Sequence, residues 1–158
     1  MVILRIWLPS RKTPRSKGFS SIDVDSPSGS TYMSVRPVDP KEDRLLKTPT
    51  ATLADDIEAE GGDTPHLWRF RNLDEARMMR IWDQFKGLGA AKWKNDATEN
   101  CFHFCDMVLA AGQGIDVEAF SGASLTNRAK GALHLATLAF SHTTLAARAE
   151  DYLKVRHC

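Results

Sequence analysis

The stretch Thr98-Glu99-Asn100-Cys101-Phe102-His103-Phe104-Cys105 decides how the rest of the chain is interpreted, and it opens an apolar run that continues to about Ala111. Asn100 or Thr98 can cap a helix here, because a short polar side chain accepts a hydrogen bond from a free N–H of the first turn. Cys101 would then lie in that turn, where the positive end of the helix dipole favours a thiolate. The sequence therefore predicts a helix with Cys101 as a candidate nucleophile. The alternative is a buried, unreactive cysteine.

The first half of the chain carries the pattern of an antiparallel sheet. Val2–Leu8, Phe19–Val24 and Thr31–Val35 are short stretches rich in β-branched and aromatic residues, which favour strands. The turn residues of Asp25–Gly29 join the second and third of them into a hairpin. His66–Arg71 alternates apolar and polar residues, as a half-buried strand does.

Helices are predicted around and after this sheet. A short helix is expected near Leu53–Ala59. Asn72, followed three residues later by Glu75, has the spacing of a capping box at the start of another helix. Four apolar residues at helical spacing predict one buried face of that helix: Met78, Ile81, Trp82 and Phe85. From about Leu125 to His157 the chain is rich in Ala and Leu, which predicts one long or two shorter helices. The fold class is therefore α+β, a small antiparallel sheet packed against the cysteine-bearing helix, with additional C-terminal helices.

Composition excludes several functional classes. The chain has 158 residues, which fits one domain, and a net charge of +1, which favours neither nucleic acid nor an anionic membrane. Its three cysteines argue against a disulfide framework. Cys101 and Cys105 share a helix face, but no second pair with ligand spacing accompanies them, so no metal and no cofactor is expected. The sequence has no run of about 18 apolar residues, so no transmembrane helix is expected, and the N-terminal residues do not have the pattern of a signal peptide. A basic loop is expected to be solvated, although it could meet phosphate or lipid headgroups; its cations are Arg11, Lys12, Arg15 and Lys17.

The sequence Asn100-Cys101-Phe102-His103-Phe104 resembles the Asn-Cys-Glu-His-Phe signature of the lecithin:retinol acyltransferase-like enzymes. These belong to the circularly permuted branch of the NlpC-type papain-like cysteine hydrolases. The resemblance implies a β-rich N-terminal half that carries a base histidine, followed by a cysteine at the start of a helix. It covers roughly residues 1–112, so residues 113–158 are interpreted as a helical C-terminal extension of a single domain spanning residues 1–158.

The resemblance also shows which part is missing. The family pattern Gly-His-hydrophobic-Ser-hydrophobic matches Gly18-Phe19-Ser20-Ser21-Ile22, so Phe19 occupies the position of the base histidine. Phenylalanine cannot accept a proton. The relatives carry a second histidine on the next strand, but that strand reads Tyr32-Met33-Ser34-Val35 here.

Another histidine could replace the base. His66 begins the fourth predicted strand and could approach Cys101 from a neighbouring strand. His103 lies about 200° around the helix from Cys101 and points away. His134 and His142 fall on the tail helices. Three accounts remain open: a natural loss giving a pseudoenzyme, a base supplied by His66, or an inactivating substitution at residue 19.

The expected function is that of a papain-like thiol hydrolase or acyltransferase acting on an amide or ester bond through Cys101. Its substrate would be a peptide, a protein or a lipid acyl group. The alternative is a non-catalytic interaction domain that uses the same cleft for a protein partner. Bacterial effectors and toxins use this fold, so a cytoplasmic protein, or one exported without a signal peptide, is expected.

Overall fold

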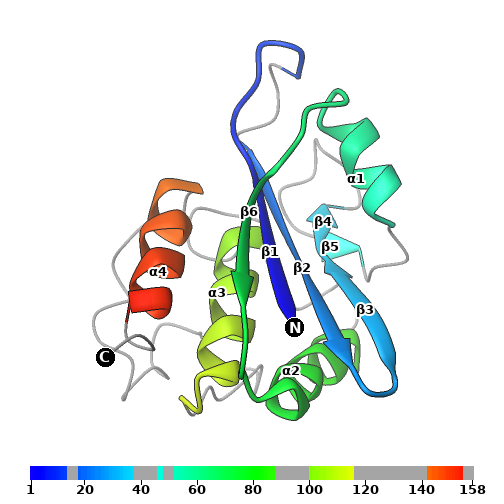
Figure 1. Cartoon of the computed structure of the whole chain (residues 1–158). Coiled ribbons are helices and arrows are strands. Elements are labelled where there is room, and N and C mark those ends of the chain that lie inside the picture. The colour runs from blue at the N-terminus through cyan, green and yellow to red at the C-terminus, as the bar shows by residue number, and fades with distance from the viewer. Residues whose placement is uncertain (14–17, 38–45, 48–51, 88–99, 116–141, 155–158) are drawn as a thin grey trace.

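The computed structural model describes residues 1–13, 18–37, 46–47, 52–87, 100–115 and 142–154. Four antiparallel strands form the main sheet in the order β3-β2-β1-β6. Their bounds are β1 Val2–Trp7, β2 Phe19–Ser26, β3 Gly29–Ser34 and β6 His66–Phe70. The α+β class with a small antiparallel sheet is confirmed, and the four strands lie where the sequence predicts them (Figure 1).

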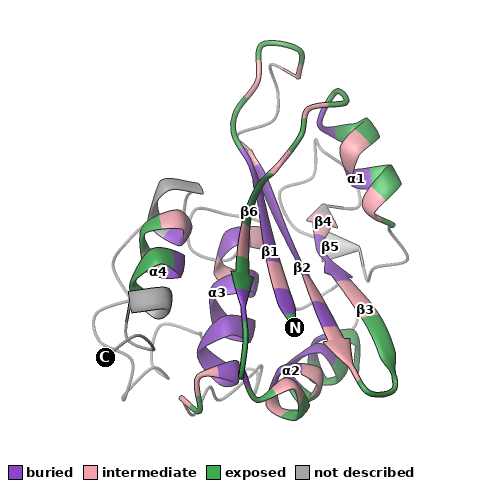
Figure 2. Cartoon of the chain, viewed as in Figure 1, coloured by how far each residue is buried: buried purple, intermediate pink, exposed green. Residues whose placement is uncertain are grey.

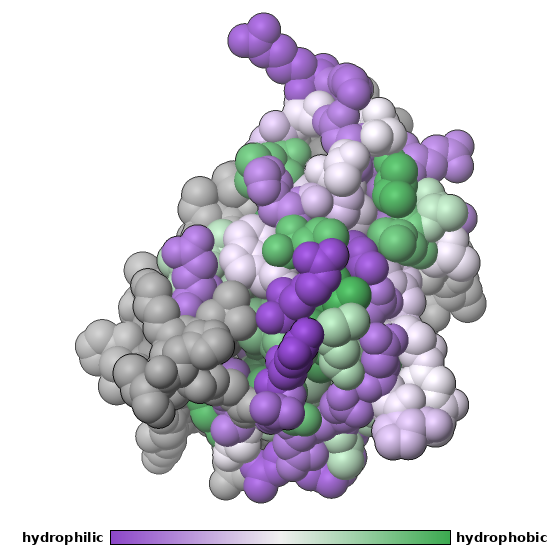
Figure 3. All heavy atoms as spheres, in the orientation of Figure 1, coloured by the Kyte–Doolittle hydropathy of each residue, from purple (hydrophilic) through white to green (hydrophobic). Residues whose placement is uncertain are grey.

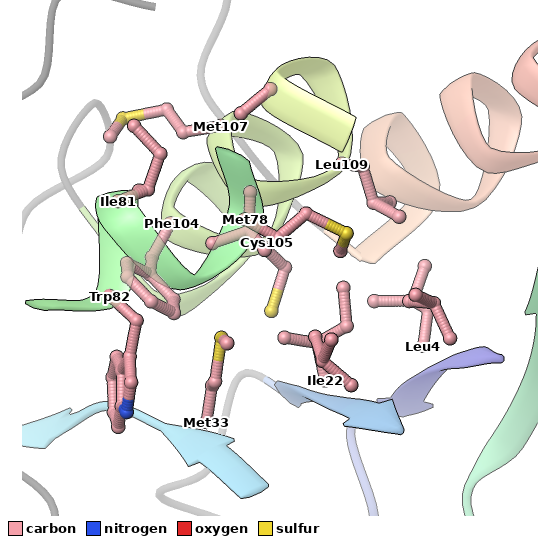
Figure 4. Close-up of a cluster of buried hydrophobic side chains, with 14 of the residues drawn as sticks. Leu4, Ile22, Met33, Met78, Ile81, Trp82, Phe104, Cys105, Met107 and Leu109 are labelled. Carbon is pink, nitrogen blue, oxygen red and sulfur yellow. The ribbon is translucent and has the colours of Figure 1, made fainter. Parts of the chain in front are cut away.

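One face of the sheet is apolar, because side chains alternate between the two faces along each strand and the apolar positions of neighbouring strands are paired. Leu4 of β1 lies opposite Ile22 of β2 and Trp68 of β6, and Ile22 lies opposite Met33 of β3. Side chains at paired positions point to the same face, so these residues form one continuous surface. Three helices cover that surface: α2 Glu75–Gly87, α3 Cys101–Gly112 and α4 His142–Lys154. Figure 4 shows side chains of α2 and α3 meeting those of the strands in the core.

Helix α2 buries the predicted face but begins later than predicted. Its buried residues are Met78, Ile81, Trp82 and Phe85. Asn72 is not the N-cap of this helix. Its φ of 59° is in the left-handed region, and the residue lies outside the helix. The Asp74 carboxylate instead accepts a hydrogen bond from the Arg77 N–H at 3.0 Å, as an N-cap residue does.

The other face of the sheet is polar and meets helix α1 Leu53–Ala59, which lies where it is predicted. Thr52 and Asp55 form a capping box at its start. The sequence did not reveal the short antiparallel pair β4 Arg36–Pro37 and β5 Leu46–Lys47. Figure 2 shows the contrast: α1 has both exposed and buried residues, whereas α3 is almost entirely buried.

The predicted C-terminal helices are described in part. Helix α4 packs on α3 through Leu145 and Ala149, both fully buried. The Nε of Arg148 lies 2.5 Å from a carboxylate oxygen of the buried Asp106 in α3. The rest of the predicted tail, residues 116–141 and 155–158, lies outside the described residues.

Candidate functional site

Cys101 is the first residue of α3, as predicted, and Asn100 caps the helix. The Asn100 side-chain oxygen accepts hydrogen bonds from the backbone N–H of Phe102 at 3.0 Å and of His103 at 3.1 Å. Asn100 itself has extended backbone angles, which an N-cap residue requires. The cap therefore places the Cys101 thiol at the positive end of a 12-residue helix.

The thiol faces Ser20 of β2. Both the backbone N–H and the hydroxyl of Ser20 interact with the Cys101 sulfur. Extending the β2–β3 register would place Ser20 opposite Val35, but β3 ends at Ser34, which leaves this part of β2 open to the helix. The start of α3 thus occupies the place where the sheet stops pairing.

Ser20 also lies beside the second thiol, that of Cys105, one helical turn after Cys101. The Ser20 side chain is 1% exposed, and its oxygen has no well-formed hydrogen bond. Sulfur is a weak hydrogen-bonding partner, so long contacts with two thiols leave this hydroxyl poorly satisfied. The two cysteines and Ser20 form one compact cluster between α3 and β2.

Burial raises the pKa of Cys101 from 9.0 to about 11. The Ser20 N–H and hydroxyl and the positive charge of Arg36 lower this pKa, while Glu60 raises it, and burial outweighs them all. Cys101 is partly exposed, whereas Cys105 is buried, and with its pKa above neutral pH the thiolate of Cys101 is the minor form at pH 7. Burial raises the pKa of Cys105 further still. Both cysteines are therefore neutral thiols at neutral pH.

Phe19 lies on the face of β2 opposite Ser20, because neighbouring residues of a strand point to opposite faces. Its side chain is 3% exposed. The ring centroid lies 5.7 Å from that of Trp7, its partner in β1, and 3.6 Å from the guanidinium carbon of Arg36. The position that the resemblance assigns to a base thus holds a ring between an indole and a cation.

Arg36 is held there by two buried carboxylates of α1, which the sequence analysis missed. Its Nε lies 2.5 Å from Asp56 and its Nη1 lies 2.9 Å from Glu60. The Tyr32 hydroxyl donates to Asp56 at 2.5 Å and lies 2.9 Å from the Ser21 hydroxyl, whose proton it can accept, and burial together with Asp56 raises the pKa of Tyr32. The only sequence signal was the i, i+4 spacing of the two acids, which places them on one helix face.

His66 is not brought to the thiol. It lies at the start of β6, opposite Ile6, and Ile6 lies opposite Ser20. Two strand spacings therefore separate His66 from Ser20, about 10 Å, with the fully buried Ile6 between them. The His66 side chain is exposed, and its ring neighbour is Trp68 at 6.3 Å.

The remaining histidines give no imidazole at the thiol within the described residues. His103 lies two positions along α3 and is partly buried. His142 opens α4, but its side chain is outside the described part, as are His134 and His157 entirely. Among the described residues, the charged groups that shift the pKa of Cys101 are the guanidinium of Arg36 and the carboxylate of Glu60.

The described residues contain no group of three or more His, Cys, Asp or Glu side chains that could hold a metal ion. None of the helices described is long and apolar enough to cross a membrane.

No protein-family model matches the chain, and comparison with curated proteins and with solved structures found no match.

Proposed function

We propose that this chain is a relative of the permuted papain-like thiol hydrolases that has lost catalysis and acts as an interaction domain. The observation that supports this most directly is the surroundings of the Cys101 sulfur. Burial keeps it protonated, and its described neighbours are Ser20, Arg36 and Glu60 rather than an imidazole. The substrate cleft of an active relative would then serve to bind a protein partner.

The loss of rate expected without a general base and without an ionised thiol supports the same proposal. A general base contributes typically 10²–10⁴-fold to such a reaction. A thiol whose pKa lies well above 7 is ionised in only a small fraction of its molecules at pH 7. The N-terminal dipole of α3 favours the thiolate, but it acts on a sulfur that burial has already made neutral.

The pH dependence of Cys101 alkylation tests the proposal. The rate with iodoacetamide is measured by mass spectrometry of the Cys101 peptide, from pH 6 to pH 10.5. Because the thiolate is the nucleophile, we expect the rate to rise tenfold per pH unit across most of this range, without a plateau. A plateau below pH 8 would show an activated thiol and would refute the non-catalytic proposal.

A matched substitution tests the role of residue 19. Because Phe19 lies on the face of β2 opposite Ser20, we expect Phe19→His alone to fall short of the 10²-fold gain that a general base brings. Phe19→Leu serves as the control for lost ring contacts. A gain of that size with histidine but not with leucine would show that residue 19 reaches the thiol after all.

The second candidate is an active thiol hydrolase or acyltransferase acting on a peptide, protein or lipid acyl group. The placement of Cys101 at a capped helix start beside β2 favours it, since the resemblance implies that arrangement. Its base would come from outside the described residues. Hydrolysis of a p-nitrophenyl ester or a peptide anilide that Cys101→Ala abolishes would support this candidate, and unchanged background hydrolysis would support the first.

A further inference from the structure

A cavity of about 460 Å³ lies at the end of the sheet away from α2, between the loop after β1 and the segment before β6. It is an open pocket rather than an enclosed one, and its volume is within the range of small-molecule sites. It is lined by Trp7, Leu8, Pro9, Ser10, Arg11, Asp63, Thr64 and His66. Figure 3 shows strongly hydrophilic residues at the top of the molecule, where this loop lies in Figure 1.

The two walls of the cavity are tied together through Asp63. The indole Nε1 of Trp7 donates to the backbone oxygen of Asp63 at 2.9 Å. The Nζ of Lys12 lies 2.5 Å from the Asp63 carboxylate, and the Lys12 N–H donates to the Ser10 hydroxyl at 3.2 Å. The two bonds to Asp63 join residues more than 50 positions apart, so they connect the two walls of the cavity.

The charges on the walls do not cancel. Asp63 is the only acidic residue that lines the cavity, and Lys12 together with Ser10 lowers its pKa, so its negative charge is already neutralised by Lys12. Arg11 makes no ion pair with any residue in the described part of the chain. Arg11 and His66 therefore both line the cavity, and Arg11 has no ion-pair partner among the described residues.

The apolar side of the cavity lies next to this cation. Leu8 is 48% exposed and lines the cavity with Pro9 and Trp7. A ligand with an apolar group could cover Leu8, while its anionic group meets Arg11. A guanidinium presents a rigid fork of N–H donors that matches the oxygens of a phosphate.

We propose that this cavity binds a small phosphate monoester that carries an apolar group, with Arg11 and His66 on the phosphate and Leu8 and Pro9 on the apolar part. The site is separate from Cys101 and does not depend on the function proposed above. Carboxylates share the oxyanion chemistry but offer fewer oxygens, so they are expected to bind more weakly.

Binding can be followed through the indole N–H resonances of Trp7 and Trp82 in ¹⁵N-labelled protein. Trp7 lines the cavity, whereas Trp82 is buried under α2 and serves as an internal reference for folding. The probes are phenyl phosphate, inorganic phosphate and benzoate. We expect phenyl phosphate to shift the Trp7 resonance and leave Trp82 in place, and to bind more tightly than either of the other two.

Two variants with the same change of charge decide whether Arg11 is responsible. Since a hydrogen bond to a charged group is worth enough for about a tenfold change or more, Arg11→Gln should weaken phenyl phosphate binding by at least that factor. Arg80→Gln, on the exposed side of α2, and Cys101→Ala should leave binding unchanged. An unshifted Trp7 resonance, or equal weakening in Arg11→Gln and Arg80→Gln, would overturn the proposal. Tighter binding of benzoate would overturn the choice of phosphate.

Discussion

Removing the Asp56 carboxylate tests whether the buried cluster under α1 holds Arg36 in place. Asp56 is 0% exposed, and its two oxygens receive the Arg36 Nε–H and the Tyr32 hydroxyl, each at 2.5 Å. Asp56→Ala leaves a buried cation and a buried phenol without this partner. Breaking a buried ion pair from one side costs about 3–5 kcal/mol.

The structure narrows that range. Arg36 keeps its contact with Glu60 at 2.9 Å, and 27% of its side chain is exposed, so water can reach it after the change. We therefore expect a loss of about 3 kcal/mol in the free energy of unfolding, at the lower end for a broken buried pair. That is a large part of the 5–15 kcal/mol by which natural domains are stable.

Urea unfolding of three variants and their combination measures the effect. Glu58→Ala, an exposed carboxylate on the same helix, is the matched control and should change stability by under about 0.5 kcal/mol. Asp56→Ala combined with Arg36→Met should cost less than the sum of the two single changes, because the second removes the stranded cation. A loss below about 1 kcal/mol for Asp56→Ala, or strict additivity, would refute the reasoning.

Three further predictions concern the helices and the thiol. Trp82→Ala should cost about 3–5 kcal/mol of unfolding free energy, because a 4% exposed indole leaves a cavity between α2 and Phe104; a chemical denaturation midpoint little different from wild type would contradict this. Asp74→Ala should cost about 1 kcal/mol through loss of the α2 N-cap, against a smaller loss for the exposed Asp83→Ala in the same assay. Above pH 9 the unfolded state loses the Cys101 proton before the native state does. The unfolding free energy of the wild type should therefore fall relative to that of Cys101→Ala by up to about 1.4 kcal/mol per pH unit, until about pH 11. Parallel stability curves for the two proteins would show that burial does not raise the pKa of Cys101.

Local sequence signals predicted the elements that depend on local chemistry. The β-branched and aromatic residues of β1 and the turn residues after β2 predicted the strands, and the short polar residue Asn100 caps α3. The predicted N-cap of α2 was wrong, because Asn72 and Asp74 are both residue types that favour the N-cap position. The choice between them depends on where the chain turns after β6. The backbone N–H of Asp74 bonds to the Gly112 oxygen of α3 at 2.8 Å, a tertiary contact that no local pattern reveals.

The candidate site was predicted only in part, for the same reason. The helix start at Cys101 is local and was predicted, whereas its neighbours come from β2, β4 and α1. Arg36 and Asp56 lie 20 positions apart, and their ion pair depends on α1 folding over the polar face of the sheet. The exposed position of His66 follows from its place on the edge strand β6, which depends on the order of strands in the sheet.

The surroundings of Phe19 favour an aromatic ring over a cationic side chain at this position. A base that accepts the Cys101 proton becomes a cationic imidazolium, and a guanidinium 3.6 Å from the ring would oppose that charge. The same guanidinium stabilises a phenyl ring, because the face of an aromatic ring attracts a cation. Asp56 and Glu60 then hold Arg36 at that ring. With the Trp7 indole on one side and the Arg36 guanidinium on the other, these surroundings suit a phenyl ring at residue 19 better than a protonated imidazole.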